Sequence, residues 1–363
     1  MRAVFALRFA LLAVPPLAAQ QPERFTLAGT EVAIYNLAGA VTLEPGQGTL
    51  AVLVSRGGPD AARLEVEQGE LNGRETLRIR YPGERVVYAD IDRGTSTTVP
   101  VREDGTFGDG DGDGDVRHER DRHDRRHRHA GARRVRITGE GEGLRAHADL
   151  RLQVPAGREV AIYLAVGRVS VSNVDGRLHV DAHSAPVTAS GTRGELSVDV
   201  GSGSVNVTNA EGALLVDTGS GPVEVSRFRG TELSVDTGSG GVTASDIEAG
   251  DISIETGSGD IRISSASSAT VRLEAGSGSV TADLHSQVAT LEVETGSGNV
   301  AITAPGTLGA EVELETASGD IETDFALQVT RHSRDHVVGR IGDGKGRIAI
   351  ESGSGDVRLL KRS

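Results

Sequence analysis

The stretch Val235–Ala244, VDTGSGGVTA, decides the fold because variants of it recur through the second half of the chain. Related stretches begin at Val198, Val216, Ile254, Leu273, Val293, Leu314 and Ile350. The first residue of the Gly-Ser-Gly triplet falls at Gly201, Gly219, Gly238, Gly257, Gly276 and Gly296, and then at Ala317 and Gly353. The intervals are 18–21 residues, followed by one of 36. A period of this size is typical of solenoid proteins.

Each repeat reads as two short strands joined by a corner at the triplet. Apolar and polar residues alternate in Leu233–Thr237 and again in Val242–Ala244, as in strands with one buried face. Glycine on both sides of serine favours a corner, because we expect the backbone there to have φ and ψ angles that β-branched residues cannot adopt. Coils stacked about 4.8 Å apart would pair edge to edge around one narrow core. The sequence predicts an all-β chain, a single-stranded β-solenoid with coils of 18–21 residues.

The two ends of the repeat region are less regular. The interval of 36 residues is expected to hold one degenerate coil, with a loop around Arg331 to Gly346. Upstream, residues 31–43 (EVAIYNLAGAVTL) closely echo residues 159–171 (EVAIYLAVGRVSV), which predicts a first coil near 31–43. The chain then leaves the repeat and forms an irregular N-terminal β cap over one end of the solenoid. Its predicted strands are 50–54, 64–66, 77–81 and 135–137.

Within the cap, residues 105–134 are rich in Asp, Gly, Arg and His and poor in apolar residues, which predicts a disordered low-complexity insert. The predicted domains are a signal peptide at 1–19, the N-terminal β region at 20–155 and the solenoid repeats at 156–363.

The first nineteen residues have the three parts of a secretory signal peptide. Arg2 and Arg8 give a basic start, Phe9–Val14 an apolar segment, and Pro15–Ala19 a break ending in small residues. The apolar segment is shorter than the ~20 residues that a spanning helix needs. We expect cleavage after Ala19, no transmembrane anchor in the mature chain, and a periplasmic, extracellular or cell-surface location.

Composition narrows the range of partners. The 363-residue chain has a formal net charge of −14, and removal of Arg2 and Arg8 takes it to −16. An acidic surface argues against nucleic acid, whose phosphates require positive charge. With no cysteine, the chain has no disulfide, thiolate metal site or lipid-modified cysteine.

Two tracts in the insert raise the question of metal binding. The alternating Asp109, Asp111, Asp113 and Asp115 resemble the start of a calcium loop, although Arg120 stands where such a loop needs a bidentate carboxylate. His118, His123, His127 and His129 offer ligands for a transition metal. In both tracts the simpler interpretation is a solvated loop. Calcium is the one cofactor that we keep as a possibility.

The most informative surface feature is an acidic position in every clear coil, one residue beyond an inward Val, Ile or Leu. In-register stacking would place these carboxylates in one column, with neighbours about 4.8 Å apart, where like charges repel by roughly 1 kcal/mol per pair in water. The compensating interaction is predicted to be local, with each carboxylate accepting hydrogen bonds from N–H groups of the following turn. The alternative is bridging cations such as calcium. The column comprises Asp181, Asp199, Asp217, Asp236, Glu255, Glu274, Glu294, Glu315 and Glu351.

A second column holds threonines at the inner end of the strand, for which we expect hydroxyl–hydroxyl bonds along the stack. Its members are Thr218, Thr237, Thr256, Thr295 and Thr316.

No residue set indicates catalysis. His179, Asp181 and Ser184 are close in sequence, but nothing supplies an oxyanion hole or a pocket for them. A carbohydrate-active β-helix enzyme, with or without a requirement for calcium, is the main alternative. The chain has carboxylates for that role, but aromatic residues for stacking on sugars make up only 3% of it.

The stretches VDTGSGPVEV, IETGSGDIRI and IESGSGDVRL, together with the signal peptide and the degenerate β start, resemble the adhesin-like family of bacterial β-strand-repeat proteins. The resemblance covers roughly 30–363 and is strongest over 160–363. It implies an extracytoplasmic β-solenoid of unknown function without catalytic residues. We therefore expect a non-enzymatic scaffold that binds a cell-envelope or extracellular macromolecule, a protein or a polysaccharide. An accessory or sensor domain of an envelope-stress system is a further alternative.

Overall fold

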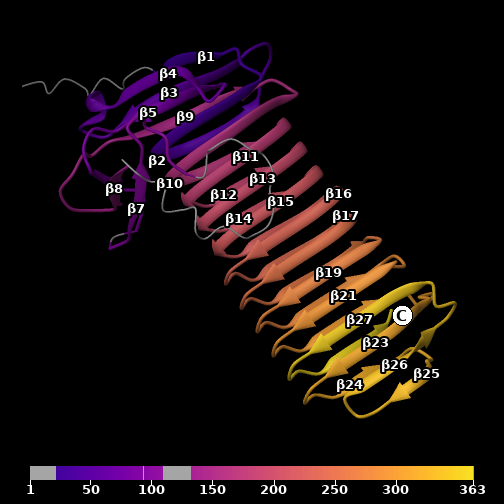
Figure 1. Cartoon of the computed structure of the whole chain (residues 1–363). Coiled ribbons are helices and arrows are strands. Elements are labelled where there is room, and N and C mark those ends of the chain that lie inside the picture. Colours follow the sequence, from indigo (N-terminus) through magenta and orange to yellow (C-terminus); the bar gives the residue numbers. More distant parts are fainter. Residues whose placement is uncertain (1–21, 93, 109–131, 363) are drawn as a thin grey trace, which may run out of the picture.

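The computed structural model describes residues 22–92, 94–108 and 132–362. These residues form an all-β chain, as predicted, with one short 3-10 helix, η1 (Ala61–Arg63). Figure 1 shows a long stack of strands with an irregular region at its N-terminal end. The predicted signal peptide and the tract Asp109–Asp115, with the four insert histidines, lie outside the described residues.

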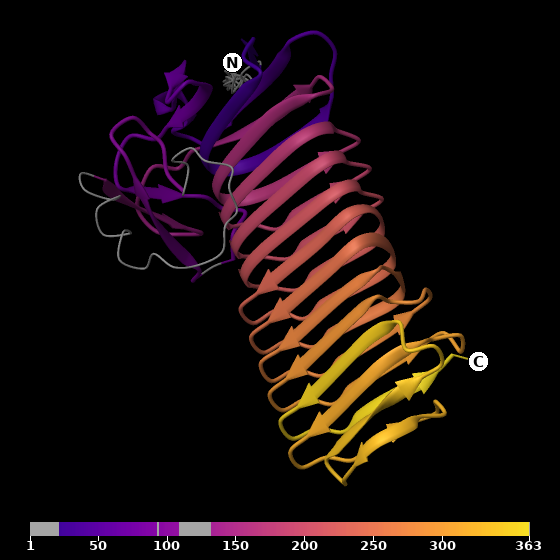
Figure 2. The same ribbon diagram turned by 45° about the vertical axis from the view of Figure 1, so that its right-hand side comes forward.

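The coils stack into two facing walls, seen side-on in Figure 2. In each coil the chain crosses one wall, called wall 1, turns at the Gly-Ser-Gly triplet or its equivalent, crosses the other wall, called wall 2, and returns to wall 1. Four long strands, β2, β10, β16 and β17, bend from one wall into the other. Wall 1 contains β2 (Glu31–Pro45), β10 (Arg158–Ser172), β11 (Asp175–Ser184), β13 (Arg193–Ser202), β15 (Glu211–Ser220), β16 (Val223–Thr237), β17 (Val242–Thr256), β19 (Thr270–Ala275), β21 (Thr290–Thr295), β27 (Gly346–Ser352) and β23 (Ala310–Thr316). Wall 2 adds β12 (Val187–Ser190), β14 (Val205–Thr208), β18 (Ile261–Ser267), β20 (Val280–Leu284), β22 (Val300–Ala304), β28 (Val357–Lys361) and β24 (Ile321–Thr323).

Neighbouring coils pair in parallel and in register. Val180 pairs with Val198 and Val198 with Val216, an offset of 18 residues. A bulge that accommodates Thr231 raises the offset to 19, so that Val216 pairs with Val235. The inward residues of both walls are almost entirely Val, Ile, Leu and Ala and are buried. The thin core therefore follows directly from the alternating pattern.

The triplet glycines are required mainly by the close approach of neighbouring coils. A β-carbon on Gly238 would lie 2.7 Å from the carbonyl oxygen of Gly219, and one on Gly278 would overlap the carbonyl oxygen of Gly259. Positive φ angles occur at Gly203 and Gly221 but not at most other triplet glycines. The predicted conformational reason for glycine was therefore wrong for most coils, and the reason is steric.

Most of the threonine column caps the turns. Thr256 Oγ1 accepts a bond from Gly259 N at 2.9 Å and donates to Gly240 O of the preceding coil at 3.0 Å. Thr218 is an exception, because its Oγ1 is buried with no hydrogen-bond partner among the described residues. The expectation that the hydroxyls bond one another was wrong, because the carbonyl and N–H groups of the turns are nearer partners. The arrangement of Thr256 recurs at Thr295, Thr316 and Ser352.

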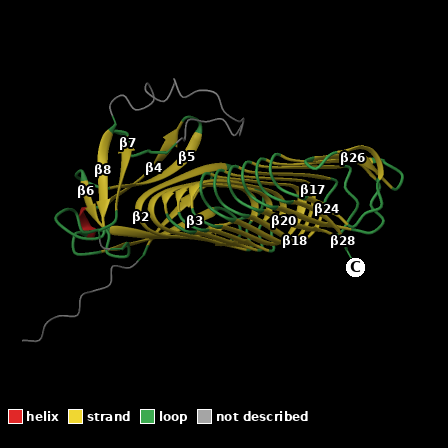
Figure 3. Ribbon diagram, turned by 90° about the horizontal axis from the view of Figure 1, so that it is seen from below, coloured by secondary structure: helices red, strands yellow, loops and turns green. Residues whose placement is uncertain are grey.

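At the N-terminal end, β2 pairs with β10 along nearly its whole length, from Glu31 opposite Glu159 to Leu43 opposite Val171, which confirms the predicted first coil. Its other edge is covered by β5 (Arg74–Arg80) in wall 1 and β9 (His147–Val154) in wall 2. Beyond them lie β4 (Glu65–Leu71), β3 (Leu50–Gly57) and β1 (Glu23–Leu27). A small separate sheet projects from this end (Figure 3) and consists of β6 (Arg85–Val87), β8 (Arg133–Thr138) and β7 (Ser96–Val101).

The ends of the predicted insert belong to the folded protein. Phe107 is 3% exposed, and Arg133 and Arg134 lie in β8. The boundaries 105–134 were therefore wrong at both ends, because Phe107 supplies apolar area and β8 pairs with β6 and β7.

At the C-terminal end the coils do not follow the order of the sequence. Strand β27 pairs with β21 on one side and β23 on the other, and β28 likewise lies between β22 and β24. Figure 1 shows the order β21, β27, β23. Between β24 and β27 the chain forms an antiparallel hairpin, β25 (Gln328–His332) and β26 (His336–Ile341), and β26 pairs with β23. The predicted degenerate coil was therefore wrong.

Candidate functional site

The predicted carboxylate column exists as a continuous row on the outer face of wall 1. The pairs run in register from Asp181–Asp199 through Asp236–Glu255 to Glu274–Glu294. The row then passes from Glu294 to Glu351 and from Glu351 to Glu315, because β27 is inserted between β21 and β23. We call these nine residues the carboxylate row.

Most of the row lacks the compensation found elsewhere on the surface. Off the row, several carboxylates pair with arginines of the adjacent coil, as Glu195 does with Arg177 at 3.1 Å and Glu292 with Arg272 at 3.1 Å. Within the row, six members form no ion pair with any described residue: Asp217, Asp236, Glu274, Glu294, Glu315 and Glu351. The negative charge of these six residues is therefore available to a partner.

The row carboxylates were predicted to accept hydrogen bonds from the N–H groups of the following turn, but the threonine hydroxyls accept bonds from these groups instead. Gly240 N donates to Thr237 Oγ1 at 3.0 Å, and Gly298 N to Thr295 Oγ1 at 3.1 Å. Partial burial, and then the neighbouring charge of Asp236, raise the pKa of Asp217. Repulsion along the row is thus felt at Asp217 in the folded protein.

Burial of the Asp217 carboxylate, together with repulsion by Asp236, predicts a stability gain for Asp217→Asn. The raised pKa means that the folded chain loses stability as pH rises from about 3.9, the unfolded value, through the folded pKa. At pH 7 the Asn variant should unfold at a higher temperature than the unchanged protein, and the difference should vanish below that window. Thermal unfolding at pH 7 and pH 3.5 measures this. Glu292→Gln, which removes a paired carboxylate, should give no such gain; an equal gain there would contradict the argument.

The surface beside the middle of the carboxylate row carries only small side chains. One side is the corner of the triplet, where Gly238 and Gly257 have no side chain and the exposed side chains are the small serines Ser239 and Ser258. On the other side, two residues before Asp236 and Glu255 in their strands, stand the small residues Ser234 and Ser253. A partner can therefore reach the carboxylates of these coils without displacing bulky groups.

At its N-terminal end the row is continued by aromatic residues. Tyr35 pairs with Tyr163, which pairs with Asp181. The two rings stack with centroids 4.4 Å apart and 6° between their planes, and Phe107 packs edge-on to Tyr35 at 6.0 Å. The sequence analysis missed this cluster, although the repeated EVAIY stretch placed both tyrosines at the row position. The aromatic cluster covers the outer face at this end, and the carboxylate row therefore ends here.

His179 and Ser184, whose closeness in the sequence did not indicate catalysis, each contact a serine of the next coil in the structure. His179 Nδ1 lies 3.3 Å from Ser197 Oγ, while Ser184 Oγ accepts from Ser202 Oγ at 3.2 Å. Burial, and then the charge of Arg74, lower the pKa of His179. His179 and Ser184 therefore have serines of the next coil as partners.

A groove of about 710 Å³ lies between the small sheet and the turns of wall 1. Tyr88 donates to Asp90 at 3.2 Å, and Arg168 contributes a guanidinium 3.4 Å from the same carboxylate. Burial and Asp90 raise the pKa of Tyr88 to about 12. The opposite side is lined by Ser184, Pro186 and Ser202. The groove combines an aromatic ring with charged and hydroxyl groups, and no pattern in the sequence indicated it.

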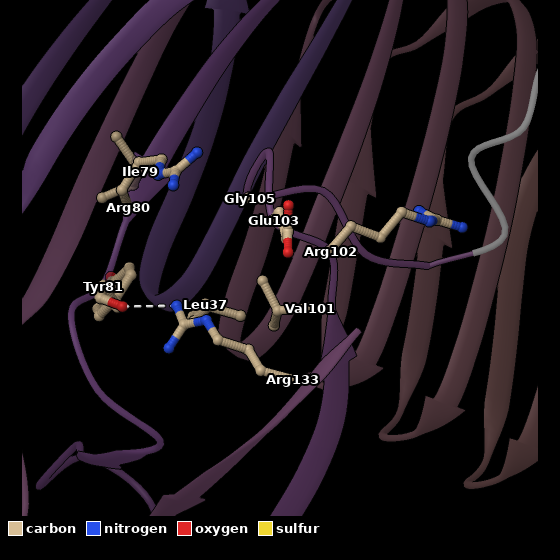
Figure 4. A pocket seen from close by; sticks show the side chains of 9 residues that line it. All are labelled: Leu37, Ile79, Arg80, Tyr81, Val101, Arg102, Glu103, Gly105 and Arg133. Atoms are coloured by element: carbon tan, nitrogen blue, oxygen red, sulfur yellow. Dashed lines mark hydrogen bonds between the residues drawn. The ribbon is translucent and has the colours of Figure 1, made fainter. Parts of the chain in front are cut away.

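The enclosed cavity in Figure 4 has a structural role. Its volume of about 20 Å³ accommodates one water molecule. The Arg133 guanidinium donates to the Tyr81 carbonyl at 2.7 Å and also to the Gly83 carbonyl, which ties β8 to the end of β5.

One cluster of possible metal ligands in the described residues lies at the C-terminal end of the row, formed by Glu313, Glu315 and His336. His336 Nε2 is 3.1 Å from Glu313 Oε1. Sequence reasoning missed it because the three residues meet only through the β23–β26 pairing.

The comparisons with known proteins agree with a repeat domain of unknown function. Residues 192–360 match the family model described as Toastrack DUF4097. No curated protein matches the chain. A crystal structure of a "putative cell adhesion protein" from Clostridium sporogenes matches with 8% identity over 94% of this chain and 100% of its own, at a TM-score of 0.21, which is too low to show a common fold.

None of the helices in the described residues has the length and apolar character needed to cross a membrane.

Proposed function

We propose that this protein is a non-enzymatic, exported β-solenoid scaffold that binds a cell-envelope or extracellular macromolecule through the carboxylate row. The observation that carries the proposal is a contrast in pairing: several acidic groups beside the row, such as Glu195, Glu211 and Glu292, have arginine partners, whereas six members of the row have none among the described residues. The match of residues 192–360 to a family of unknown function is compatible with such a scaffold.

The chemistry of the row indicates a partner with cationic groups at regular intervals. Exposed charges are screened over about 8 Å at physiological ionic strength, so binding should weaken steeply as salt is added. Many such contacts on one rigid face also act together, because each bound group raises the effective concentration of the next. A basic protein surface or an amino-bearing polysaccharide fits these requirements.

The test is binding of the mature chain to isolated envelope material at low and high salt. The row variant Asp217→Asn, Asp236→Asn, Glu274→Gln should bind at least tenfold more weakly than the unchanged protein. The control variant Glu211→Gln, Glu248→Gln, Glu292→Gln changes net charge equally but removes carboxylates paired with arginines. It should bind normally. Equal loss in both variants, or no saturable binding at all, would contradict the proposal.

A carbohydrate-active enzyme is the second candidate, favoured by the groove beside Tyr88 and Asp90. Turnover of an acidic polysaccharide that disappears in Asp90→Asn would establish it in place of the scaffold.

A further inference from the structure

We propose that Glu313, Glu315 and His336 form a binding site for a divalent transition metal, with zinc as the best fit. The site would lie where the carboxylate row meets the antiparallel hairpin that ends wall 1. It is independent of the proposed function, because it needs neither a partner nor the rest of the row.

The ligand geometry follows from strand pairing. Glu313 and Glu315 are two residues apart on β23, so both side chains project from the outer face. His336 stands directly opposite Glu315 on β26. One ligand atom from each residue lies within 4.8 Å of the other two, and Nε2 of His336 is already 3.1 Å from Oε1 of Glu313. Small side-chain rotations would bring all three onto one ion with bonds of about 2.0–2.2 Å.

The donor set favours zinc over calcium. Zinc accepts imidazole nitrogen together with carboxylate oxygen in four-coordinate sites, whereas calcium requires six to eight oxygen ligands. Three protein ligands also leave one tetrahedral position open for water or for a group of a bound partner.

The surrounding charges leave the cluster available to a cation. Two arginines of this region are occupied: Arg340 pairs with Glu311 and Arg334 with Asp320. Glu315 forms no ion pair with a described residue and has the carboxylate of Glu351 as its other neighbour in the row. The imidazole is held in place, since its side chain is only 20% exposed. A bound ion would offset the negative charge and join β23 to β26.

The test uses the full mature chain with His118, His123, His127 and His129 changed to Gln, so that the insert cannot bind zinc. Equilibrium dialysis should give one bound zinc ion per chain. Because a ligand that binds the folded state stabilises it, zinc should also raise the melting temperature more than calcium does at the same concentration. His336→Gln should reduce zinc affinity at least tenfold. His332→Gln, on the exposed neighbouring strand β25, is the matched control and should change nothing.

Three results would overturn the proposal: no zinc bound by the background chain, zinc binding unchanged in His336→Gln, or an equal loss in His332→Gln. A calcium effect as large as that of zinc would also overturn the choice of metal.

Discussion

Replacing Phe228 by alanine is expected to lower the free energy of unfolding by about 3–5 kcal/mol. Phe228 is 1% exposed and is among the largest fully buried side chains, in a core otherwise made mainly of aliphatic residues. It pairs with Ile247 of the next coil, while Ala210 occupies the corresponding place one coil earlier. Because the Phe228 ring is fully buried, alanine at position 228 would create a cavity in the middle of the stack.

Urea unfolding followed by circular dichroism measures the effect, with the midpoint and the slope reported separately because repeat arrays need not unfold in one step. Phe228→Leu is the control. Leucine retains much of the side-chain volume, so this variant should lower the free energy of unfolding clearly less than Phe228→Ala does. An alanine variant as stable as the leucine variant would mean that the core collapses around the site.

The second large effect is expected from Gly278→Ala. The added β-carbon would overlap the carbonyl oxygen of Gly259, a backbone atom that can move only if two hydrogen-bonded coils separate. Overpacking of this kind costs about 1–3 kcal/mol or more. The variant should melt at a clearly lower temperature than the unchanged protein.

Ser277→Ala is the matched control, because Ser277 is the neighbouring residue of the same turn and is exposed. Exposed substitutions of this kind usually change stability by less than about 0.5 kcal/mol. If both variants melted like the unchanged protein, the close packing of triplet on triplet would be contradicted.

The repeated stretch was sufficient to predict the strands, the all-β class and the carboxylate row. Alternation placed Val235 inward and Asp236 outward, and in-register stacking then made the row unavoidable. The echo between residues 31–43 and 159–171 located the first coil for the same reason, since equivalent residues pair directly.

The order of the last coils was beyond prediction from sequence. The stretches at Leu314 and Ile350 have the same pattern, so either can pair with Val293, and the repeat alone does not choose between them. The structure places Ile350 next to Val293. The zinc-site candidates depend on this region too, because His336 reaches Glu315 only through a hairpin, in a segment where a loop was expected.

The turn chemistry was also mispredicted, for a local physical reason. An acidic residue before a glycine turn commonly accepts its N–H bonds, but here the following Thr256 lies on the inner side and reaches Gly259 N itself. The acidic neighbour Glu255 is exposed on the outer face. The hydroxyl, being inside the corner, is the closer acceptor.

The scaffold proposal depends on the carboxylate row as the structure orders it, and spin-label distances test that order directly. The chain has no cysteine, so Asp217→Cys can be combined with Glu351→Cys or Glu315→Cys without other changes. With strands about 4.8 Å apart, five steps to residue 351 predict about 24 Å and six steps to residue 315 about 29 Å. Residue 315 lying nearer than residue 351, or distances too broad to resolve, would contradict the account.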